Sequence, residues 1–284
     1  MSKTVRELLV QATASLRDIS DTPRLEARIL LERATGFSQV QTITKSEEQI
    51  SSDSLYMFQQ MLSRRLNHEP MAYILGEREF YGRDFKVTKD TLIPRPDTET
   101  LVEIAINYIN SLDYRPSVLD LCTGTGCVGI SVAAECDCDI ALADISTKAL
   151  ECAKYNAENL LNQKTDIIET NLFSNCKIYD IIISNPPYLT HEWCEEASEE
   201  VQKEPRLALE GFSEDGLSLI RDIVKDAPSH LSGNKSAIFI ECDYRQTLEL
   251  KKILENTGFT EVKIYKDLND KQRVVGGTYV RTIN

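Results

Sequence analysis

The sequence predicts an α/β protein with a mostly parallel sheet, preceded by a small all-helical region. Two observations lead to this prediction. Residues 1 to about 70 show only helical periodicity, and from Pro94 onward short apolar runs alternate with helical stretches. At 284 residues the chain is long enough for one large domain and a smaller one.

The helical region contains three amphipathic stretches with recognisable ends. The first begins at the capping-box pair Thr4 and Glu7, and the second begins at Thr22-Pro23 and ends at Gly36. The third runs roughly over residues 52–67. Their apolar stripes are interpreted as the core of a small bundle.

Residues 73–93 change to short alternating runs around Gly82, which predicts a hairpin between two domains. We therefore expect a helical domain over 1–72, a hairpin linker over 73–93 and an α/β domain over 94–284.

The α/β region contains five short apolar runs that are expected to be strands. Helical stretches between most of them imply a parallel sheet covered on both faces, with its ligand at the carboxyl ends of the strands. The runs are residues 117–121, 140–144, 166–170, 179–184 and 236–241.

Composition and charge make nucleic acid and membranes poor partners. The net charge is −13 and the pI about 4.8, so the overall field repels phosphate and anionic lipid. The densest basic pairs, Arg64-Arg65 and Lys251-Lys252, are interpreted as solvated helix faces. We expect no direct nucleic-acid partner.

The sequence gives little sign of a leader peptide, a membrane-spanning helix or a metal site. The chain starts without a long apolar segment, and no stretch approaches the roughly 18 apolar residues of a membrane helix. Eight cysteines lack CxxC spacing and only three histidines are present, with Cys136-Asp137-Cys138 as the one weak exception. We expect a cytoplasmic monomer without membrane association or metal.

A glycine loop follows the first expected strand, at Cys122, Thr123, Gly124, Thr125 and Gly126. Such a loop fits dinucleotide enzymes, nucleoside-dependent methyltransferases and plain tight turns. The second strand ends about 18 residues later in Asp144, where a carboxylate can accept hydrogen bonds from both ribose hydroxyls. The alternative is an Asp that caps the helix starting near Thr147.

The fourth strand ends in Asn185-Pro186-Pro187-Tyr188, at the same edge of the sheet. Two prolines stiffen the backbone and cannot donate hydrogen bonds. The Asn185 side chain and the Pro186 carbonyl can therefore present two acceptors to a planar NH2 group, with Tyr188 as a flat wall. The alternative is an ordinary Pro-rich turn.

This tetrapeptide resembles the [N/D/S]PP[Y/F] signature of amino-methyltransferases that use S-adenosylmethionine. Together with four further stretches, it resembles the release-factor glutamine methyltransferase family, known as HemK or PrmC. The stretches are EPMAYILGEREF (69–80), TLIPRPDTETLVE (91–103), DLCTGTG (120–126) and EPRLAL (204–209).

The resemblance implies a Rossmann-like class I methyltransferase domain with a seven-stranded, mostly parallel sheet. It implies methylation of the glutamine side-chain nitrogen in the Gly-Gly-Gln motif of class I peptide-chain release factors, which supports translation termination. The cofactor would be S-adenosylmethionine, released as S-adenosylhomocysteine, and the helical domain would help to grip the release factor.

Site residues carried over from the family fall into two groups. Residues 122–126 and Asp144 would bind the cofactor, with Asn171 and Leu172 near its adenine. Asn185 would bridge cofactor and substrate, and Pro186, Pro187 and Tyr188 would complete the glutamine slot. Asn185, Pro186 and Tyr188 are the expected catalytic residues.

Two further residues are expected at the substrate side. Arg95 would lie at the pocket mouth with the residues up to Glu99, and Phe80 would help to wall the pocket. The rival interpretation of Arg95 is a surface salt bridge with Asp97 or Glu99.

The chain departs from the family pattern in two places. Cys122 replaces the usual first glycine of the loop, so that this backbone position must tolerate a Cβ atom. Asn171-Leu172 replaces an acidic-aromatic pair, which removes a charge and a stacking ring.

Three alternatives remain from the sequence. An adenine-N6 DNA or RNA methyltransferase could use the same tetrapeptide, although the acidic charge opposes it. A related family that methylates a ribosomal-protein glutamine shares the NPPY signature. A cofactor-binding sensor without catalysis is the non-enzyme alternative.

Overall fold

The computed structural model describes residues 3–233 and 235–281, which divide into two compact units. The helical unit comprises the chain up to Gly76 together with Glu199–Lys203. The α/β unit comprises Glu77–Ser198 and the chain from Glu204 onward. Among the described residues, no helix is both long and apolar enough to cross a membrane.

The helical unit forms where its capping signals and apolar stripes predict. The helices are α1 (Val5–Ser15), α2 (Pro23–Thr35), α3 (Gln39–Thr44), α4 (Ser52–Leu66) and α5 (Met71–Leu75). Thr4 and Glu7 close a capping box on α1, and Gly36 ends α2 in the left-handed conformation. The core includes Leu8, Leu30 and Phe58 from three of these helices. The two short helices, α3 and α5, were not predicted.

The prediction that Arg65 lies on a solvated helix face is wrong. Its side chain is 1% exposed and pairs with Glu26, at 2.7 Å between Nε and Oε2, and with Glu200. Arg64 pairs with Glu69 at the surface. A cation buried this deeply needs anionic partners, and Glu200 comes from a segment far along the chain that periodicity does not assign to the bundle.

The α/β unit is built on a seven-stranded sheet with the order β5-β4-β3-β6-β7-β9-β8. All pairings are parallel except those of β9 with β7 and β8. The strands are β3 (Ser117–Leu121), β4 (Asp139–Asp144), β5 (Asp166–Glu169), β6 (Ile181–Ser184), β7 (Ser236–Glu241), β8 (Thr260–Lys266) and β9 (Gln272–Tyr279). The predicted fold class is confirmed. The first strand, β3, lies between β4 and β6, which is the switch point where such sheets bind ligands.

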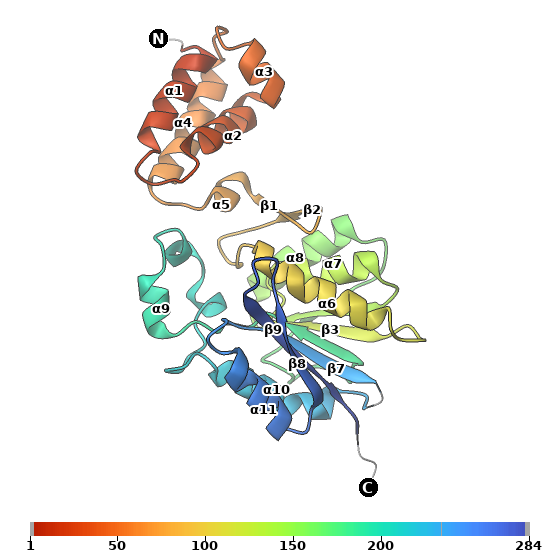
Figure 1. The fold of residues 1–284 in the computed structure, drawn as a ribbon. Coiled ribbons are helices and arrows are strands. Elements are labelled where there is room, and N and C mark those ends of the chain that lie inside the picture. Colours follow the sequence, from red (N-terminus) through yellow and green to blue (C-terminus); the bar gives the residue numbers. More distant parts are fainter. Residues whose placement is uncertain (1–2, 234, 282–284) are drawn as a thin grey trace. The chain divides into compact units, whose positions relative to one another are not determined.

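Helices cover both faces of this sheet (Figure 1). The helices of the α/β unit are α6 (Glu99–Ile109), α7 (Cys127–Glu135), α8 (Thr147–Leu160), α9 (His191–Glu196), α10 (Ser218–His230) and α11 (Thr247–Asn256), and all but the short α9 cover the sheet. Three-residue 3-10 turns lie at Pro96–Thr98 (η1), Val201–Lys203 (η2) and Arg206–Ala208 (η3). One core layer joins α6, α7 and α8 to the sheet, and the other joins α10 and α11 to its opposite face.

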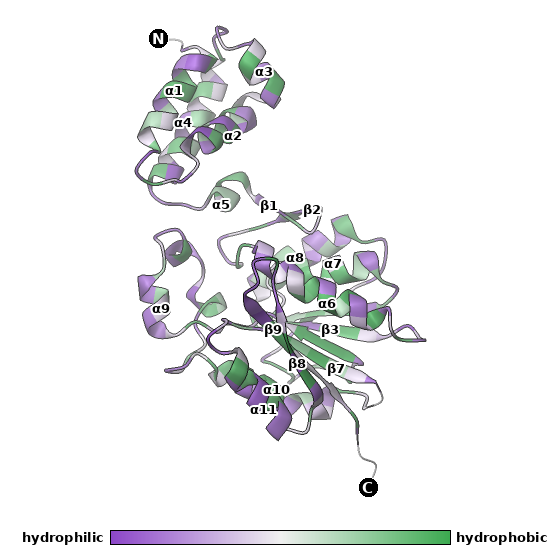
Figure 2. Ribbon diagram, viewed as in Figure 1, coloured by the Kyte–Doolittle hydropathy of each residue, from purple (hydrophilic) through white to green (hydrophobic). Residues whose placement is uncertain are grey.

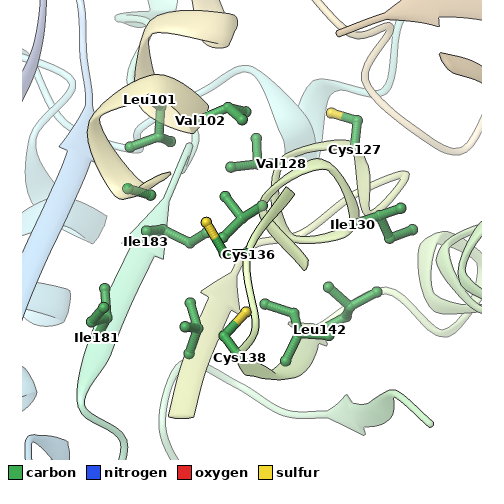
Figure 3. Close-up of a cluster of buried hydrophobic side chains, with 14 of the residues drawn as sticks. Leu101, Val102, Cys127, Val128, Ile130, Cys136, Cys138, Leu142, Ile181 and Ile183 are labelled. Atoms are coloured by element: carbon green, nitrogen blue, oxygen red, sulfur yellow. The ribbon is translucent and has the colours of Figure 1, made fainter. Parts of the chain in front are cut away.

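The apolar pattern explains these two layers. Strands β3 and β7 are green along most of their length in Figure 2, whereas the flanking helices carry one apolar and one polar side. Figure 3 shows the first layer, in which Leu101 and Val102 of α6 lie above Ile181 and Ile183 of β6.

The hairpin of β1 (Glu77–Phe80) and β2 (Arg83–Lys86) packs within the α/β unit. Phe80 and Phe85 are buried there with ring centroids 6.1 Å apart. The side chain of Asn156 bonds both backbone groups of Lys86 and donates to the Thr125 carbonyl. The hairpin thus braces the glycine loop.

Candidate functional site

A cavity of about 430 Å³ lies at the carboxyl ends of β3, β4 and β6, a size typical of small-ligand sites. It brings together many of the predicted site residues. These are Arg95, Cys122, Thr123, Gly124, Thr125, Asp144, Asn171, Leu172, Asn185 and Pro187. Gly126, Pro186, Tyr188 and Phe80 are not among its lining residues.

The glycine loop turns through three left-handed residues. Cys122 has φ +61°, Gly124 φ +56° and Gly126 φ +81°. Gly124 lines the cavity and has no neighbour within 4 Å of the position a Cβ would take, so it leaves space there for a ligand. Cys122 therefore occupies a conformation that favours glycine, and this position does tolerate a Cβ atom.

Gly126 serves packing and is not among the residues that line the cavity. A Cβ atom there would lie 2.8 Å from Ile130 Cδ1, and the residue is the N-cap of α7. Its place in the glycine loop alone could not distinguish this role from ligand contact.

Asp120 supports the loop from beneath. Its Oδ2 accepts hydrogen bonds from the Thr123 hydroxyl at 2.6 Å and from the Gly129 N–H at 2.9 Å. Burial raises the pKa of this carboxyl group to about 7, against the lowering effect of these two bonds. The loop conformation therefore depends on a buried carboxyl group.

Asp144 has its carboxylate held by two backbone groups. Oδ2 accepts from Gly124 N–H and Oδ1 from Ser146 N–H, both at 2.9 Å. Burial raises its pKa, and these backbone bonds lower it. The alternative of Asp144 as a helix cap is wrong, because Ser146 is the N-cap of α8 and accepts from Ala149 N–H.

The Asn185-Pro186-Pro187-Tyr188 segment leaves β6 beside this loop. The Asn185 side chain donates from Nδ2 to the Thr98 hydroxyl at 3.3 Å. Pro186 is buried, and the Tyr188 hydroxyl donates to Glu241 Oε1 at 3.3 Å. The two polar side chains of the segment therefore have partners from different elements.

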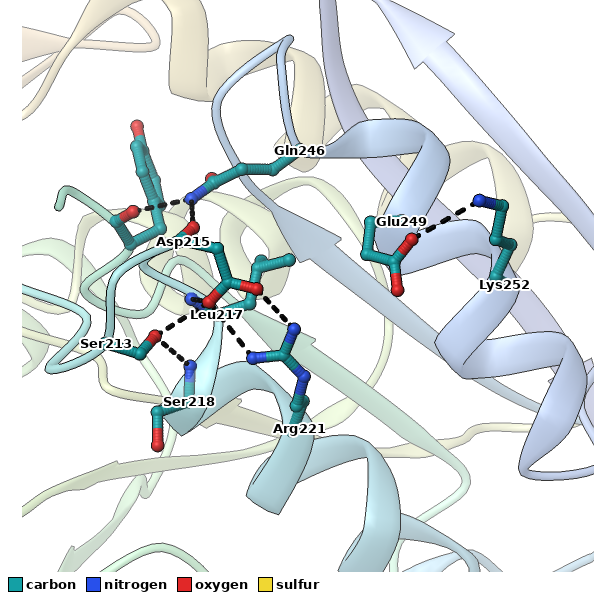
Figure 4. A network of polar contacts seen from close by, with 9 residues as sticks. Ser213, Asp215, Leu217, Ser218, Arg221, Gln246, Glu249 and Lys252 are labelled. Atoms are coloured by element: carbon teal, nitrogen blue, oxygen red, sulfur yellow. Dashed lines mark hydrogen bonds and ion pairs between the residues drawn. The ribbon is translucent and has the colours of Figure 1, made fainter.

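A polar network fixes the backbone after the prolines (Figure 4). Gln246 Nε2 donates to the carbonyls of Tyr188, at 2.8 Å, and Asp215, at 2.7 Å. Asp215 also pairs with Arg221 of α10. Gly216 permits this approach, since a Cβ atom there would lie 2.1 Å from the Tyr188 oxygen.

Arg95 lines the cavity and forms an ion pair with Glu204. The predicted alternative partners are wrong, because Asp97 pairs with Arg273 at 2.7 Å and Glu99 accepts from the Tyr81 N–H. Glu204 also accepts from the Ile93 N–H at 2.9 Å. It thereby joins the IPRPDTE and EPRLAL stretches.

The comparisons agree with this geometry. Residues 7–76 match the PrmC N-terminal domain family, and residues 103–210 match the methyltransferase small domain family. A release factor glutamine methyltransferase from Neisseria gonorrhoeae is 37% identical over 93% of this chain and 96% of its own length. The chain belongs to the release factor glutamine methyltransferase family.

Other matches place the family in a wider setting. A bifunctional methyltransferase from Rickettsia typhi is 36% identical over 97% of this chain, which spans 57% of that protein. The chain therefore spans little more than half the length of some relatives that it matches. The catalytic domain of hMettl16, solved in complex with the MAT2A 3'UTR hairpin 6, has a TM-score of 0.60 at 16% identity, covering 77% of this chain and 85% of that one. Identity this low shows the methyltransferase fold alone.

The family that the sequence resembles is confirmed. The cavity also fits the expected cofactor, S-adenosylmethionine, because it combines an oriented carboxylate at Asp144 with open space beside Gly124. The roles of individual site residues remain predictions.

Phe80 is the predicted site residue that the structure places farthest from its expected role. It is 1% exposed and packs in the core of the α/β unit, so it stabilises the hairpin and is not among the residues that line the cavity. Aromatic residues at a strand end give the same pattern in either role.

Sequence reasoning included Thr98 only as part of the 95–99 segment at the pocket mouth, where it does line the cavity, and it missed Glu204 and Glu241. All three are buried polar residues, and each bonds to a group at the cavity or in its supporting loops. Glu241 ends the apolar strand β7, as Asp144 ends β4, so the same strand-end rule would have found it. Thr98 and Glu204 carry no comparable signal.

Proposed function

We propose that this protein methylates the side-chain amide nitrogen of the glutamine in the Gly-Gly-Gln motif of class I release factors, with S-adenosylmethionine as the methyl donor. The observation that supports it most is the position of Asn185, which lines the same cavity as the glycine loop and Asp144. Membership of the family points to a glutamine substrate.

The chemistry requires positioning more than proton abstraction. When bound, S-adenosylmethionine supplies an electrophilic methyl group on a sulfonium sulfur. Asn185 Oδ1 and the Pro186 carbonyl accept hydrogen bonds from the two N–H groups of the substrate amide. These two bonds direct the nitrogen lone pair toward that methyl group. Transfer would form the carbon–nitrogen bond as the bond between the methyl carbon and sulfur breaks, with the electron pair of that bond left on sulfur and the extra amide proton lost to solvent.

The residues of the cofactor side have separate tasks in this proposal. Asp144, oriented by the N–H groups of Gly124 and Ser146, accepts from the ribose hydroxyls. The glycine loop would hold the methionine end, and Asn171 and Leu172, which line the same cavity, would contact the adenine. Tyr188 holds the tetrapeptide in place through the hydrogen bond that its hydroxyl group donates to Glu241.

The deciding experiment measures transfer of tritiated methyl groups from S-adenosylmethionine to a class I release factor. We expect incorporation into the wild-type factor and none when the glutamine of its Gly-Gly-Gln motif is replaced. Equal labelling of both factors, or labelling of RNA or DNA alone, would overturn the proposed substrate.

Asn185→Ala tests the site itself. We expect methyl transfer to fall by about 100-fold, because the substrate amide loses an acceptor that positions it. The matched control is Asn175→Ala, which removes an exposed amide that bonds the Glu169 carbonyl and is not among the residues lining the cavity. Comparable activity of the two variants would contradict the role of Asn185.

We further propose that the helical unit binds the release factor and that α3 contributes to this contact. Val40 and Ile43 are 66% and 68% exposed on this short helix. Replacing both with Ser should raise KM for the release factor and leave kcat unchanged. An unchanged KM would exclude this surface from the interaction.

A further inference from the structure

The two polar side chains of the NPPY segment approach one buried carboxyl group. The Tyr188 hydroxyl donates to Glu241 Oε1 at 3.3 Å. Asn185 Nδ2 donates to the Thr98 hydroxyl at 3.3 Å, and that hydroxyl lies close enough to the Glu241 carboxyl group to lower its pKa. Glu241 therefore stands behind both ends of the segment, one directly and one through Thr98.

Glu241 is an unusual residue for a purely structural position. Its side chain is buried at 2% exposure, and among the described residues its Oε2 atom has no hydrogen-bond partner. The nearby Arg273 of β9 is held by Asp97 and Asp267. Burial of a carboxyl group without a bonded cation is costly, and a neutral side chain of this size would avoid that cost.

The arrangement determines which end of the Asn185 amide faces the cavity. An ionised carboxylate only accepts hydrogen bonds, so it orients the single proton of the nearby Thr98 hydroxyl toward itself. The Thr98 oxygen is then left with lone pairs alone, and it can bond Asn185 only through Nδ2. Oδ1 becomes the end of the amide that is available to an N–H donor.

We propose that Thr98 and Glu241 are positioning residues that hold the Asn185 amide with Oδ1 toward the substrate nitrogen. This inference rests on the proposed amide substrate, since only an N–H donor needs an acceptor at that point. With the amide reversed, Nδ2 would face the substrate NH2 group, and two donors would repel.

The arrangement also makes methyl transfer sensitive to pH. Burial raises the pKa of Glu241 to about 7, nearby Asp97 of η1 raises it further, and Arg273 with the hydroxyls of Thr98 and Tyr188 lower it. A protonated Glu241 can donate to Thr98, whose own proton then becomes free for Asn185 Oδ1. We expect kcat to rise with pH through about 7, as Glu241 ionises.

The first experiment compares Thr98→Val with Thr98→Ser. The valine variant should lose about 10- to 100-fold in kcat while its affinity for S-adenosylmethionine stays within about twofold, and the serine variant should recover most of the activity. Thr247→Val is the matched control, because Thr247 is similarly buried and its hydroxyl donates to Gln272 Oε1. Neither Thr247 nor Gln272 is among the residues that line the cavity. Wild-type kcat in Thr98→Val would overturn the inference.

The second experiment follows the pH profile. Glu241→Gln should lower kcat and remove the rise near pH 7. Tyr188→Phe removes a donor to the charged form of Glu241, so it should move the midpoint of the rise to higher pH. An identical rise in wild type and Glu241→Gln would overturn the role of Glu241.

The third experiment needs no turnover. The side-chain amide of Asn185 is assigned by NMR from its absence in Asn185→Ala, in the complex with S-adenosylmethionine. We expect slow exchange of its NH2 protons in wild type, faster exchange in Thr98→Val, and a pH-dependent shift that is absent in Glu241→Gln. Absence of methylation by the wild type refutes the proposed function, whereas identical amide spectra in all variants refute this inference.

Discussion

Gly129→Ala should destabilise the α/β unit, although the same change stabilises most helices. Gly129 lies in the first half of α7, where alanine is normally better than glycine by about 1 kcal/mol. A Cβ atom there would lie 2.6 Å from Leu142 Cδ2 and 2.9 Å from both Cβ and Oδ2 of Asp120. None of these three atoms can move freely, because Leu142 and Asp120 are both buried in strands.

The magnitude follows from two opposing effects. Overpacking of a buried site costs about 1–3 kcal/mol. Displacement of Asp120 also weakens its bond to the Gly129 N–H, and a hydrogen bond to a charged or partly charged group is worth about 1.5–3 kcal/mol. After the gain in helix propensity, we expect a net loss of about 1–3 kcal/mol.

Differential scanning calorimetry without cofactor measures the effect, together with titration of S-adenosylmethionine. We expect a lower transition temperature for the α/β unit and weaker binding, because Asp120 also holds Thr123 of the glycine loop. Ala134→Gly, at an exposed position of the same helix, is the control, with an expected loss of at most about 1 kcal/mol. A higher transition temperature for Gly129→Ala would refute the reasoning.

Three further predictions concern the cofactor side and the buried acids. Cys122→Gly should stabilise the apo protein by less than about 1 kcal/mol, since release of left-handed strain (about 1–2 kcal/mol) exceeds the cost of glycine (about 0.5–1 kcal/mol); a lower melting temperature would contradict this. Asp144→Ala should weaken S-adenosylmethionine binding in calorimetric titration more than Asp139→Ala at the exposed start of the same strand, and equal effects would exclude Asp144 from the cofactor site. Glu241 binds a proton more tightly in the folded state (pKa about 7) than in the unfolded state (about 4.5), so its contribution to stability falls as pH rises between these values, by about 3 kcal/mol. Chemical denaturation of Glu241→Gln should show a correspondingly smaller decline in the free energy of unfolding over this pH range. The part of the decline that comes from Asp120, whose pKa is also about 7, should remain in the variant. Parallel plots of this free energy against pH for wild type and variant would contradict the assignment to Glu241.

The sheet and most of its helices were predictable because their signals are local. Strand β3 has the predicted bounds, and the capping box at Thr4 begins α1 as expected. The short helices α3 and α5 escaped prediction because five or six residues carry too little periodicity. Strands β8 and β9 are partly exposed, so no continuous apolar run marks them.

The residues of the candidate site also divide into those that the sequence predicted and those that it did not. Asp144, the glycine loop and Asn185 were found from the sequence because each ends or directly follows a buried strand. The partner of Arg95 was not, since Glu204 is 109 positions away and only the fold brings the two together. Phe80 was misplaced for a related reason, because a strand-end aromatic can face a cavity or the core.

The sequence by itself determined the family, the α/β class and the edge of the sheet where the cavity lies. These depend on strand ends and turns, whose meaning is set by neighbouring residues. Only the tertiary structure decided that Thr98 and Glu241, 143 positions apart, lie behind the NPPY segment and are bonded to its two polar side chains. Such contacts depend on which buried polar groups must find partners after the sheet has closed, and that is a property of packing that no short stretch of sequence contains.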